Sequence, residues 1–154
     1  MQYRKFLHPT LLLLFLLSAC CIGTRECLPP YSGYAGLRIV SASDGRDLVF
    51  GQNSVYDRSK IAFYTLSGSD TTLFEFKAEK ANSAEHDSVL IVNFFPAAET
   101  AYMRLSNGDI DTLKLAFRTH KKTSCCNASS ELNTITYNNA YELNVRNGAQ
   151  EVKK

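Results

Sequence analysis

The chain has 154 residues, 45% of them hydrophobic, and 17 Lys and Arg against 15 Asp and Glu give a formal net charge of +2. This length predicts one domain with a core large enough to fold alone. A charge this small does not support a nucleic-acid-binding face, which needs clustered Lys and Arg, so no nucleic-acid partner is expected.

The first 19 residues have the three parts of a secretory signal peptide. Arg4 and Lys5 form a positive start, an unbroken apolar run covers 11–17, and small residues occupy 18–19. A membrane-spanning helix needs roughly 18 or more apolar residues, so this run is too short to cross a bilayer. Residues 1–19 are therefore expected to be a signal peptide. Without them, the remaining Lys and Arg equal the 15 Asp and Glu in number.

Cys20 directly follows the small residues, and Leu17-Ser18-Ala19-Cys20 resembles a bacterial lipobox. In that motif cleavage precedes the cysteine, so Cys20 is the expected site of attachment of the lipid, including palmitate. Each buried methylene of such a chain contributes about 0.8 kcal/mol to membrane binding. In sorted lipoproteins, an aspartate at the next position retains the protein at the inner membrane. Cys21 stands there instead, so the resemblance implies a lipid anchor in the outer membrane. The periplasmic side is favoured over the cell surface, and the sequence does not choose between them.

Four further cysteines are Cys21, Cys27, Cys125 and Cys126, and the periplasm favours their oxidation. The preferred pairing joins Cys27 to Cys125 or Cys126, which would close a loop of about 100 residues and stabilise the fold by about 4–5 kcal/mol in the chain-entropy model. Four cysteines allow three connectivities, and the sequence does not choose among them. A strained bridge between Cys125 and Cys126 is one alternative. Another is a metal site that adds His120, although the paired C-x-x-C spacing is missing.

Short apolar runs separated by turn residues follow residue 36. In the run 73–78, apolar and polar residues alternate, which is typical of a half-buried strand. Asn107-Gly108 predicts a hairpin with a type I′ turn, which needs positive φ at both residues, and a second hairpin is expected at Asn138-Asn139. No amphipathic helix is found. About six to eight strands with turn signals every 8–12 residues predict an all-β protein, a single antiparallel β-sandwich.

Composition divides the chain into four segments. A lipidated tether rich in Pro and Gly follows the signal peptide, and a polar tail follows the sandwich. The expected segments are 1–19 for the signal peptide, 20–36 for the tether, 37–147 for the β-sandwich domain and 148–154 for the tail.

The segment from Leu37 to Leu48, LRIVSASDGRDL, resembles the opening of prealbumin-like (carboxypeptidase regulatory-like) β-sandwiches. In those proteins a strand meets a D-x-x-T-G-x-x-L turn and continues. Here Ser41 replaces the first Asp of the motif and Asp44 replaces the Thr. Together, the lipobox, this opening, the Asn-Gly-Asp hairpin and the late cysteine pair resemble small lipoproteins of Bacteroidota-type bacteria. The resemblance implies a location and a fold, and it brings no activity.

Residue patterns of common enzymes are missing from the sequence. His86 and His120 lie in polar surroundings, and there is no G-x-S-x-G elbow, H-E-x-x-H, phosphate loop or dinucleotide motif. Asp109, Asp111 and Asn107 could offer oxygens to calcium, but calcium takes six to eight, and turn chemistry explains these residues without it. No catalytic residue, cofactor or metal is therefore expected.

Three segments resemble the O-glycosylation signal of Bacteroidota-type secreted proteins, in which Asp precedes Ser or Thr and then an apolar residue or Thr. The candidate acceptors are Thr71, Ser88 and Thr112. Modification at any of them depends on its exposure.

The expected function is a non-enzymatic interaction or structural module, anchored by lipid, whose exposed strands contact an unknown envelope protein. One alternative is a glycan- or small-ligand-binding module, which predicts a row of tyrosine side chains on one open face. The chain has 8 tyrosines to supply it. The other alternative is a small metal-dependent hydrolase that uses His120, Asp109, Asp111 or the late cysteines.

Overall fold

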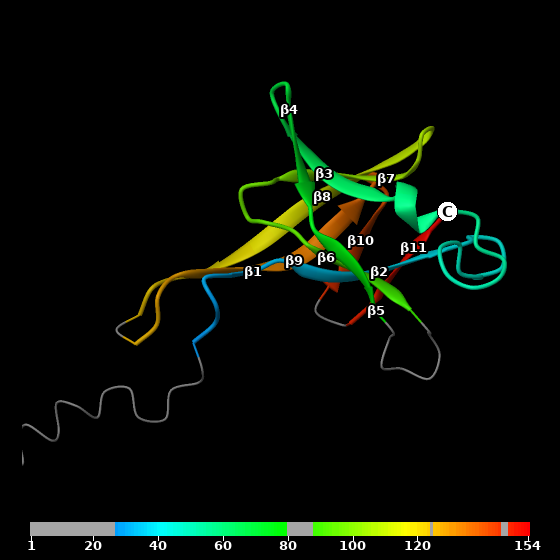
Figure 1. The fold of residues 1–154 in the computed structure, drawn as a ribbon. Helices are drawn as coiled ribbons and strands as arrows, with labels where there is room; N and C mark the ends of the chain where they lie inside the picture. The colour runs from blue at the N-terminus through cyan, green and yellow to red at the C-terminus, as the bar shows by residue number, and fades with distance from the viewer. Residues whose placement is uncertain (1–26, 80–87, 124, 146–147) are drawn as a thin grey trace, which may run out of the picture.

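The computed structural model describes residues 27–79, 88–123, 125–145 and 148–154. Its strands form a seven-stranded and a four-stranded sheet that pack together as a β-sandwich (Figure 1). No α-helix occurs in these ranges, and a short 3-10 turn, η2 (Arg58–Lys60), precedes the first long hairpin. The predicted all-β class and β-sandwich are confirmed.

The larger sheet has the strand order β1-β9-β8-β7-β3-β4, and β10 also pairs with β9. Most of its neighbours are antiparallel, while β1 runs parallel to β9. Its strands are β1 (Tyr31–Ser32), β3 (Ala62–Ser67), β4 (Asp70–Phe74), β7 (Thr100–Ser106), β8 (Asp109–His120), β9 (Ser129–Tyr137) and β10 (Tyr141–Asn144).

The smaller sheet has the order β11-β2-β6-β5, and β11 runs parallel to β2. Its strands are β2 (Tyr34–Val40), β5 (Phe76–Glu79), β6 (Val89–Asn93) and β11 (Gln150–Lys153). Only Glu75 separates β4 from β5, so the chain passes from one sheet to the other at this residue. The described residues form eleven strands, more than the six to eight expected, because the short strands β1, β5 and β11 add to the sheet margins.

Alternate side chains of both sheets meet in a continuous apolar core. Phe63 of β3 and Phe94 after β6 are fully buried, and the Phe94 ring packs edge-on against Phe63 and Phe74, with centroids 6.2 and 5.0 Å apart. Burying a phenylalanine stabilises a fold by roughly 2–3 kcal/mol. Beside this cluster, the Phe94 N–H donates to the Gly33 carbonyl. A Cβ atom at Gly33 would lie 1.6 Å from the Phe94 carbonyl oxygen, so only glycine fits there.

The sandwich extends beyond the predicted range 37–147 at both ends. Residues 31–36, expected in the tether, contain β1 and the beginning of β2, and Ala35 is buried. Residues 148–154, expected as a polar tail, contain β11, in which Val152 is fully buried. The sequence pattern missed β11 because Val152 is its single apolar residue. The strand depends on pairing with β2, more than 100 residues earlier in the chain.

The two predicted hairpins form, but the type I′ turn lies in only one of them. Asn138 and Asn139 have φ values of 45° and 54°, as that turn requires. Neither residue of Asn107-Gly108 is in the left-handed region, so the prediction of a type I′ turn there is wrong. A β-bulge between Arg104 and Ser106 shifts the register beside this turn, and bulges increase local strand twist.

Candidate functional site

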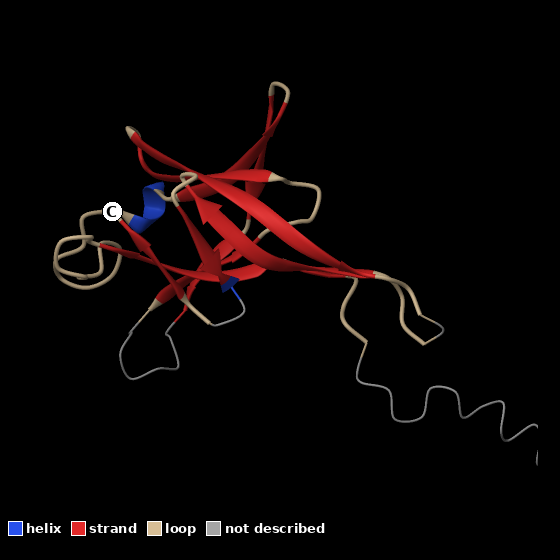
Figure 2. Ribbon diagram, turned by 180° about the vertical axis from the view of Figure 1, so that it is seen from behind, coloured by secondary structure: helices blue, strands red, loops and turns tan. Residues whose placement is uncertain are grey.

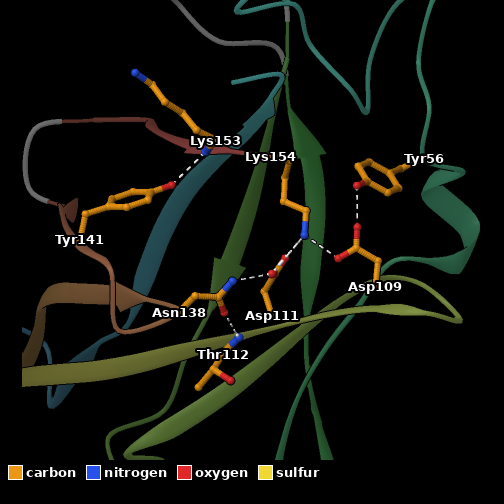
Figure 3. A network of polar contacts seen from close by, with 8 residues as sticks. All are labelled: Tyr56, Asp109, Asp111, Thr112, Asn138, Tyr141, Lys153 and Lys154. Atoms are coloured by element: carbon orange, nitrogen blue, oxygen red, sulfur yellow. Dashed lines mark hydrogen bonds and ion pairs between the residues drawn. The ribbon is translucent and has the colours of Figure 1, made fainter. Parts of the chain in front are cut away.

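A partly buried cluster of polar side chains joins the two sheets near the beginning of β8 (Figure 3). The Lys154 Nζ atom donates to Asp111 Oδ2 at 2.8 Å and to Asp109 Oδ1 at 2.5 Å. The Tyr56 hydroxyl donates to Asp109 Oδ2 at 2.6 Å, and Asn138 Nδ2 donates to Asp111 Oδ1 at 2.7 Å. Asp111 is only 4% exposed, so its charge depends on these partners.

The fold positions each member of this cluster, which we call the inter-sheet clamp (Tyr56, Asp109, Asp111, Asn138 and Lys154). Asp109 and Asp111 alternate along β8 and share the inward face of their sheet. Lys154 follows β11, and its backbone is held in place because its N–H donates to the Val40 carbonyl and its carbonyl accepts from the Ala42 N–H. Two segments far apart in the sequence therefore supply the opposite charges.

These contacts fix the protonation states of the clamp. Burial and the hydrogen bond to Asp109 raise the pKa of Tyr56 to about 12. Burial opposes the charge on Asp109, but hydrogen bonds from Lys154 and Tyr56 hold the pKa of Asp109 below its usual value. Burial likewise opposes the charge on Lys154, but the two carboxylates raise the pKa of Lys154. A general acid or base needs a pKa near the working pH, and these three groups are shifted away from neutrality.

The ammonium group of Lys154 lies between the two carboxylates that were considered as calcium ligands. It is within hydrogen-bond distance of both Asp109 and Asp111, and it satisfies them as a cation would. Within the described ranges, no group of three or more His, Cys, Asp or Glu side chains is placed to hold a metal ion. The clamp therefore acts as an ion-paired connection between the sheets.

The residues nominated for a hydrolase do not come together. His120 lies at the end of β8 opposite to Asp109 and Asp111, where its Nε2 atom is 2.9 Å from Glu131 Oε1. A strand rises about 3.3 Å per residue, which separates His120 from Asp111 by roughly 30 Å. These side chains therefore cannot act on the same substrate atoms.

A disulfide joins Cys27 to Cys126, across a sequence separation of 99. This is one of the two predicted pairings, and it ties the segment before β1 to the loop between β8 and β9. Cys125 is disulfide-bonded as well. Disulfide sulfurs are not thiolate ligands, so the metal site proposed for these cysteines with His120 does not form in this state. The bridge between Cys125 and Cys126 is also wrong, because Cys126 is bonded to Cys27.

The predicted modification sites differ in their surroundings. The lipid-attachment residue Cys20 lies outside the described residues. Thr71 in β4 is exposed, whereas Ser88 and Thr112 are half-buried. Asp111, which precedes Thr112 in its signal, is buried and bound by Lys154. Of the three glycosylation signals, the one at Thr71 is therefore the most open to a modifying enzyme.

The face of the larger sheet that points away from the smaller sheet carries an apolar surface. Tyr64 of β3 and Tyr102 of β7 are cross-strand neighbours whose rings stack, with centroids 5.3 Å apart and planes at 24°. Leu73 is opposite Tyr64 on β4 and is 67% exposed. Leu66 and Ile110 on the same face are 50% and 51% exposed. We call these five residues the outer strip.

Sequence reasoning found the tyrosines but missed the aliphatic part of the outer strip. In the runs that contain Leu66 and Leu73, apolar side chains point to both faces of the hairpin, with Phe63 and Phe74 buried on the other side. The sequence does not reveal which face meets the second sheet. One sequence feature could have indicated the exposed leucines, because these runs contain more apolar residues than one buried face requires.

Comparisons with family models, curated proteins and solved structures found no match for this chain. Among the described residues, no helix has the length and apolar character needed to span a bilayer. The likeness to prealbumin-like lipoproteins therefore stays an expectation drawn from short motifs.

Proposed function

We propose that this chain is a non-enzymatic binding module, held at the outer membrane by a lipid on Cys20, that contacts an envelope protein through the outer strip. The observation that carries this proposal is the exposure of Leu66, Leu73 and Ile110 on one open sheet face. A contiguous group of exposed apolar side chains is characteristic of interaction surfaces. Tyrosines are enriched at such surfaces because they bury a large area with few rotatable bonds.

A glycan ligand is the second candidate, and the stacked Tyr64–Tyr102 pair favours it. Sugars bind by stacking on an aromatic face. In this pair each ring covers one face of the other, so half of the stacking area is already occupied. Leu66, Leu73 and Ile110 offer no hydrogen bond to sugar hydroxyls. The aliphatic part of the outer strip therefore favours a protein partner over a glycan.

Charged residues at one side of the outer strip define the partner further. Arg104 of β7 lies directly opposite Ile110, and Lys114 lies two residues beyond Thr112 on β8. Both cationic side chains are exposed on the same face as Tyr102. Complementary charges across an interface steer association and fix its orientation. We expect the partner to place carboxylates over this end of the outer strip.

The non-enzymatic part of the proposal is supported by the clamp. Asp109, Lys154 and Tyr56 have pKa values shifted away from neutrality, and His120 lies at the other end of β8. A stability role explains why these charges are buried between two sheets. A substrate would have to displace Lys154 from both carboxylates to reach them.

The lipid anchor is tested by fractionation of cells that produce the full chain with Cys20→Ala. The proposal predicts that the unaltered protein incorporates labelled palmitate and partitions with outer membranes. The variant should remain unprocessed or appear in the soluble fraction. Normal processing and unchanged membrane partition of the variant would refute the anchor.

The interaction surface is tested with a photo-crosslinking amino acid placed at Ile110 in living cells. The matched control carries the same group at Val55, which is 61% exposed but lies in the loop between β2 and β3, outside the outer strip. We expect a discrete protein adduct from position 110, weakened at least tenfold by Leu73→Lys, and none from position 55. Equal adducts from both positions, or none from position 110, would contradict the proposal.

A further inference from the structure

We propose that the free edge of β4 accepts an extended, basic segment of the partner protein as an additional strand of the larger sheet. This inference rests on the proposed function, because it specifies how the partner meets the outer strip. The β3–β4 hairpin projects from the rest of the sandwich, as Figures 1 and 2 show from opposite sides. Among the described strands, β4 lies at the end of the sheet order and pairs with β3 alone.

Three other sheet margins carry features that hinder pairing. At β11, the Lys153 N–H donates to the Tyr141 hydroxyl at 2.9 Å, which uses a backbone donor of that edge. The edge strand β5 carries the charged pair Lys77 and Glu79. The strand β1 has only two residues and follows two prolines. Proteins use charges, prolines and very short strands to prevent pairing at sheet edges.

After Asp70, the residues of β4 are uncharged and well suited to pairing. Thr71, Thr72 and Leu73 are all exposed, and β-branched residues favour extended backbone. An edge strand presents unpaired N–H and C=O groups, which give affinity to an added strand through main-chain hydrogen bonds. Because Leu73 belongs to the outer strip, an added strand would extend that apolar surface.

A cleft of about 440 Å³ lies between the β3–β4 hairpin and the segment 95–100. Thr65 and Thr72 line it from the hairpin, and Phe95 and Glu99 line it from the other side. The Thr65 hydroxyl donates to the Thr100 carbonyl at 2.7 Å and fixes the base of the cleft. Side chains of a strand alternate between faces, so an added strand would direct every second side chain toward the cleft and the others over the outer strip.

The charges around the cleft identify the occupant as basic. Asp70 begins β4, Glu75 directly follows its end, and Glu99 lines the cleft. All three carboxylates are exposed. The hairpin 62–74 and the segment 94–99 contain no Lys or Arg. A second copy of β4, paired antiparallel, would bring Asp70 close to the Glu75 end of its partner, and like charges across a ladder are destabilising. A segment with Lys or Arg at its ends satisfies these carboxylates.

The test measures binding of a synthetic peptide of alternating valine and threonine, with lysine at both ends, to the processed protein. We expect saturable binding that slows hydrogen exchange of those β4 amides that point away from β3. Methylation of the peptide backbone nitrogens should abolish it. Glu99→Lys should weaken binding of the lysine-ended peptide at least tenfold. The same variant should bind a peptide with glutamate at both ends, which the parent chain should not bind. Glu142→Lys, an exposed reversal on β10, is the matched control and should leave binding unchanged.

Three results would overturn this inference. These are equal binding of the methylated peptide, equal binding by the Glu99→Lys chain, and concentration-dependent dimerisation through β4 in sedimentation experiments without peptide. The last result would identify a second copy as the occupant. If the peptide fails to bind while position 110 still forms its adduct in cells, the edge inference is wrong and the proposed function stands. Loss of the adduct would refute the proposed function itself.

Discussion

The ammonium group of Lys154 lies 2.8 Å from the carboxylate of Asp111, and this ion pair connects the end of the smaller sheet to β8 of the larger one. The side chains are 17% and 5% exposed, so water screens the pair weakly. A second link lies nearby, because the Lys153 N–H donates to the hydroxyl of Tyr141 on β10. Together these contacts close one side of the sandwich.

The variant Lys154→Met tests the clamp. It leaves the carboxylates of Asp109 and Asp111 partly buried without their cation, and breaking such a pair costs about 3 kcal/mol of unfolding free energy. The difference in unfolding free energy between the variant and the parent protein is measured by urea unfolding with the disulfide intact. Lys153→Met is the matched control, because that side chain is exposed, and we expect a change within about 0.5 kcal/mol. Equal losses in both variants would contradict a specific role for Lys154.

The pH dependence of stability follows from Asp109. Its pKa is lowered in the folded state from the ordinary value of 3.8, so its contribution is present above that value and is lost as the pH falls through the folded pKa. The pKa of Lys154 is raised from 10.5, so its contribution is complete below pH 10.5 and is lost only at higher pH. Unfolding free energy should therefore fall below about pH 4. Asp109→Asn should reduce the loss of unfolding free energy at acid pH. If the variant loses as much as the parent protein, other groups cause the loss.

Gly33→Ala should destabilise the fold strongly. The added methyl group would overlap the Phe94 carbonyl oxygen. To remove this clash, the backbone at Gly33, just before β2, would have to move away from Phe94. Overpacking of this kind costs about 3 kcal/mol, measured as unfolding free energy. Gly108→Ala is the control, since a Cβ atom there meets nothing within 4 Å and the residue lacks a left-handed φ. Similar stabilities for the two variants would contradict the described approach of Gly33 to Phe94.

The Cys27–Cys126 disulfide predicts a labelling pattern. A thiol reagent should modify neither residue in the unreduced, unfolded protein, and both after reduction. Replacing the pair with alanine should lower the unfolding free energy by about 4–5 kcal/mol, because the denatured chain regains the freedom of a loop of about 100 residues. Full labelling of Cys27 and Cys126 before reduction would show that this bond is absent.

Local patterns were sufficient for the parts of this fold that depend on nearby residues. The hairpins at 107–108 and 138–139 were predictable because each is formed by residues close in sequence. The pairing of Cys27 was predicted only as one of two choices. The choice between Cys125 and Cys126 depends on how β8 and β9 present their connecting loop.

The clamp could not be predicted because its members come from distant segments. Asp109 and Asp111 resembled turn residues or calcium ligands, and Lys154 resembled part of a solvated tail. Only the parallel pairing of β11 with β2 brings Lys154 to the two carboxylates. Similarly, the exposure of Leu66 and Leu73 depends on which face of the hairpin meets the second sheet, and that sheet is formed by distant segments.

The most direct test of the central claim is the yield of the adduct formed in cells from the crosslinker at Ile110, compared between the parent chain and a Leu66→Ser, Leu73→Ser variant. Unfolding free energy is determined on the same two proteins. Because both leucines are at least half exposed, we predict a stability change within about 0.5 kcal/mol and loss of the adduct. An adduct retained at full yield would contradict the assignment of the outer strip as a binding surface.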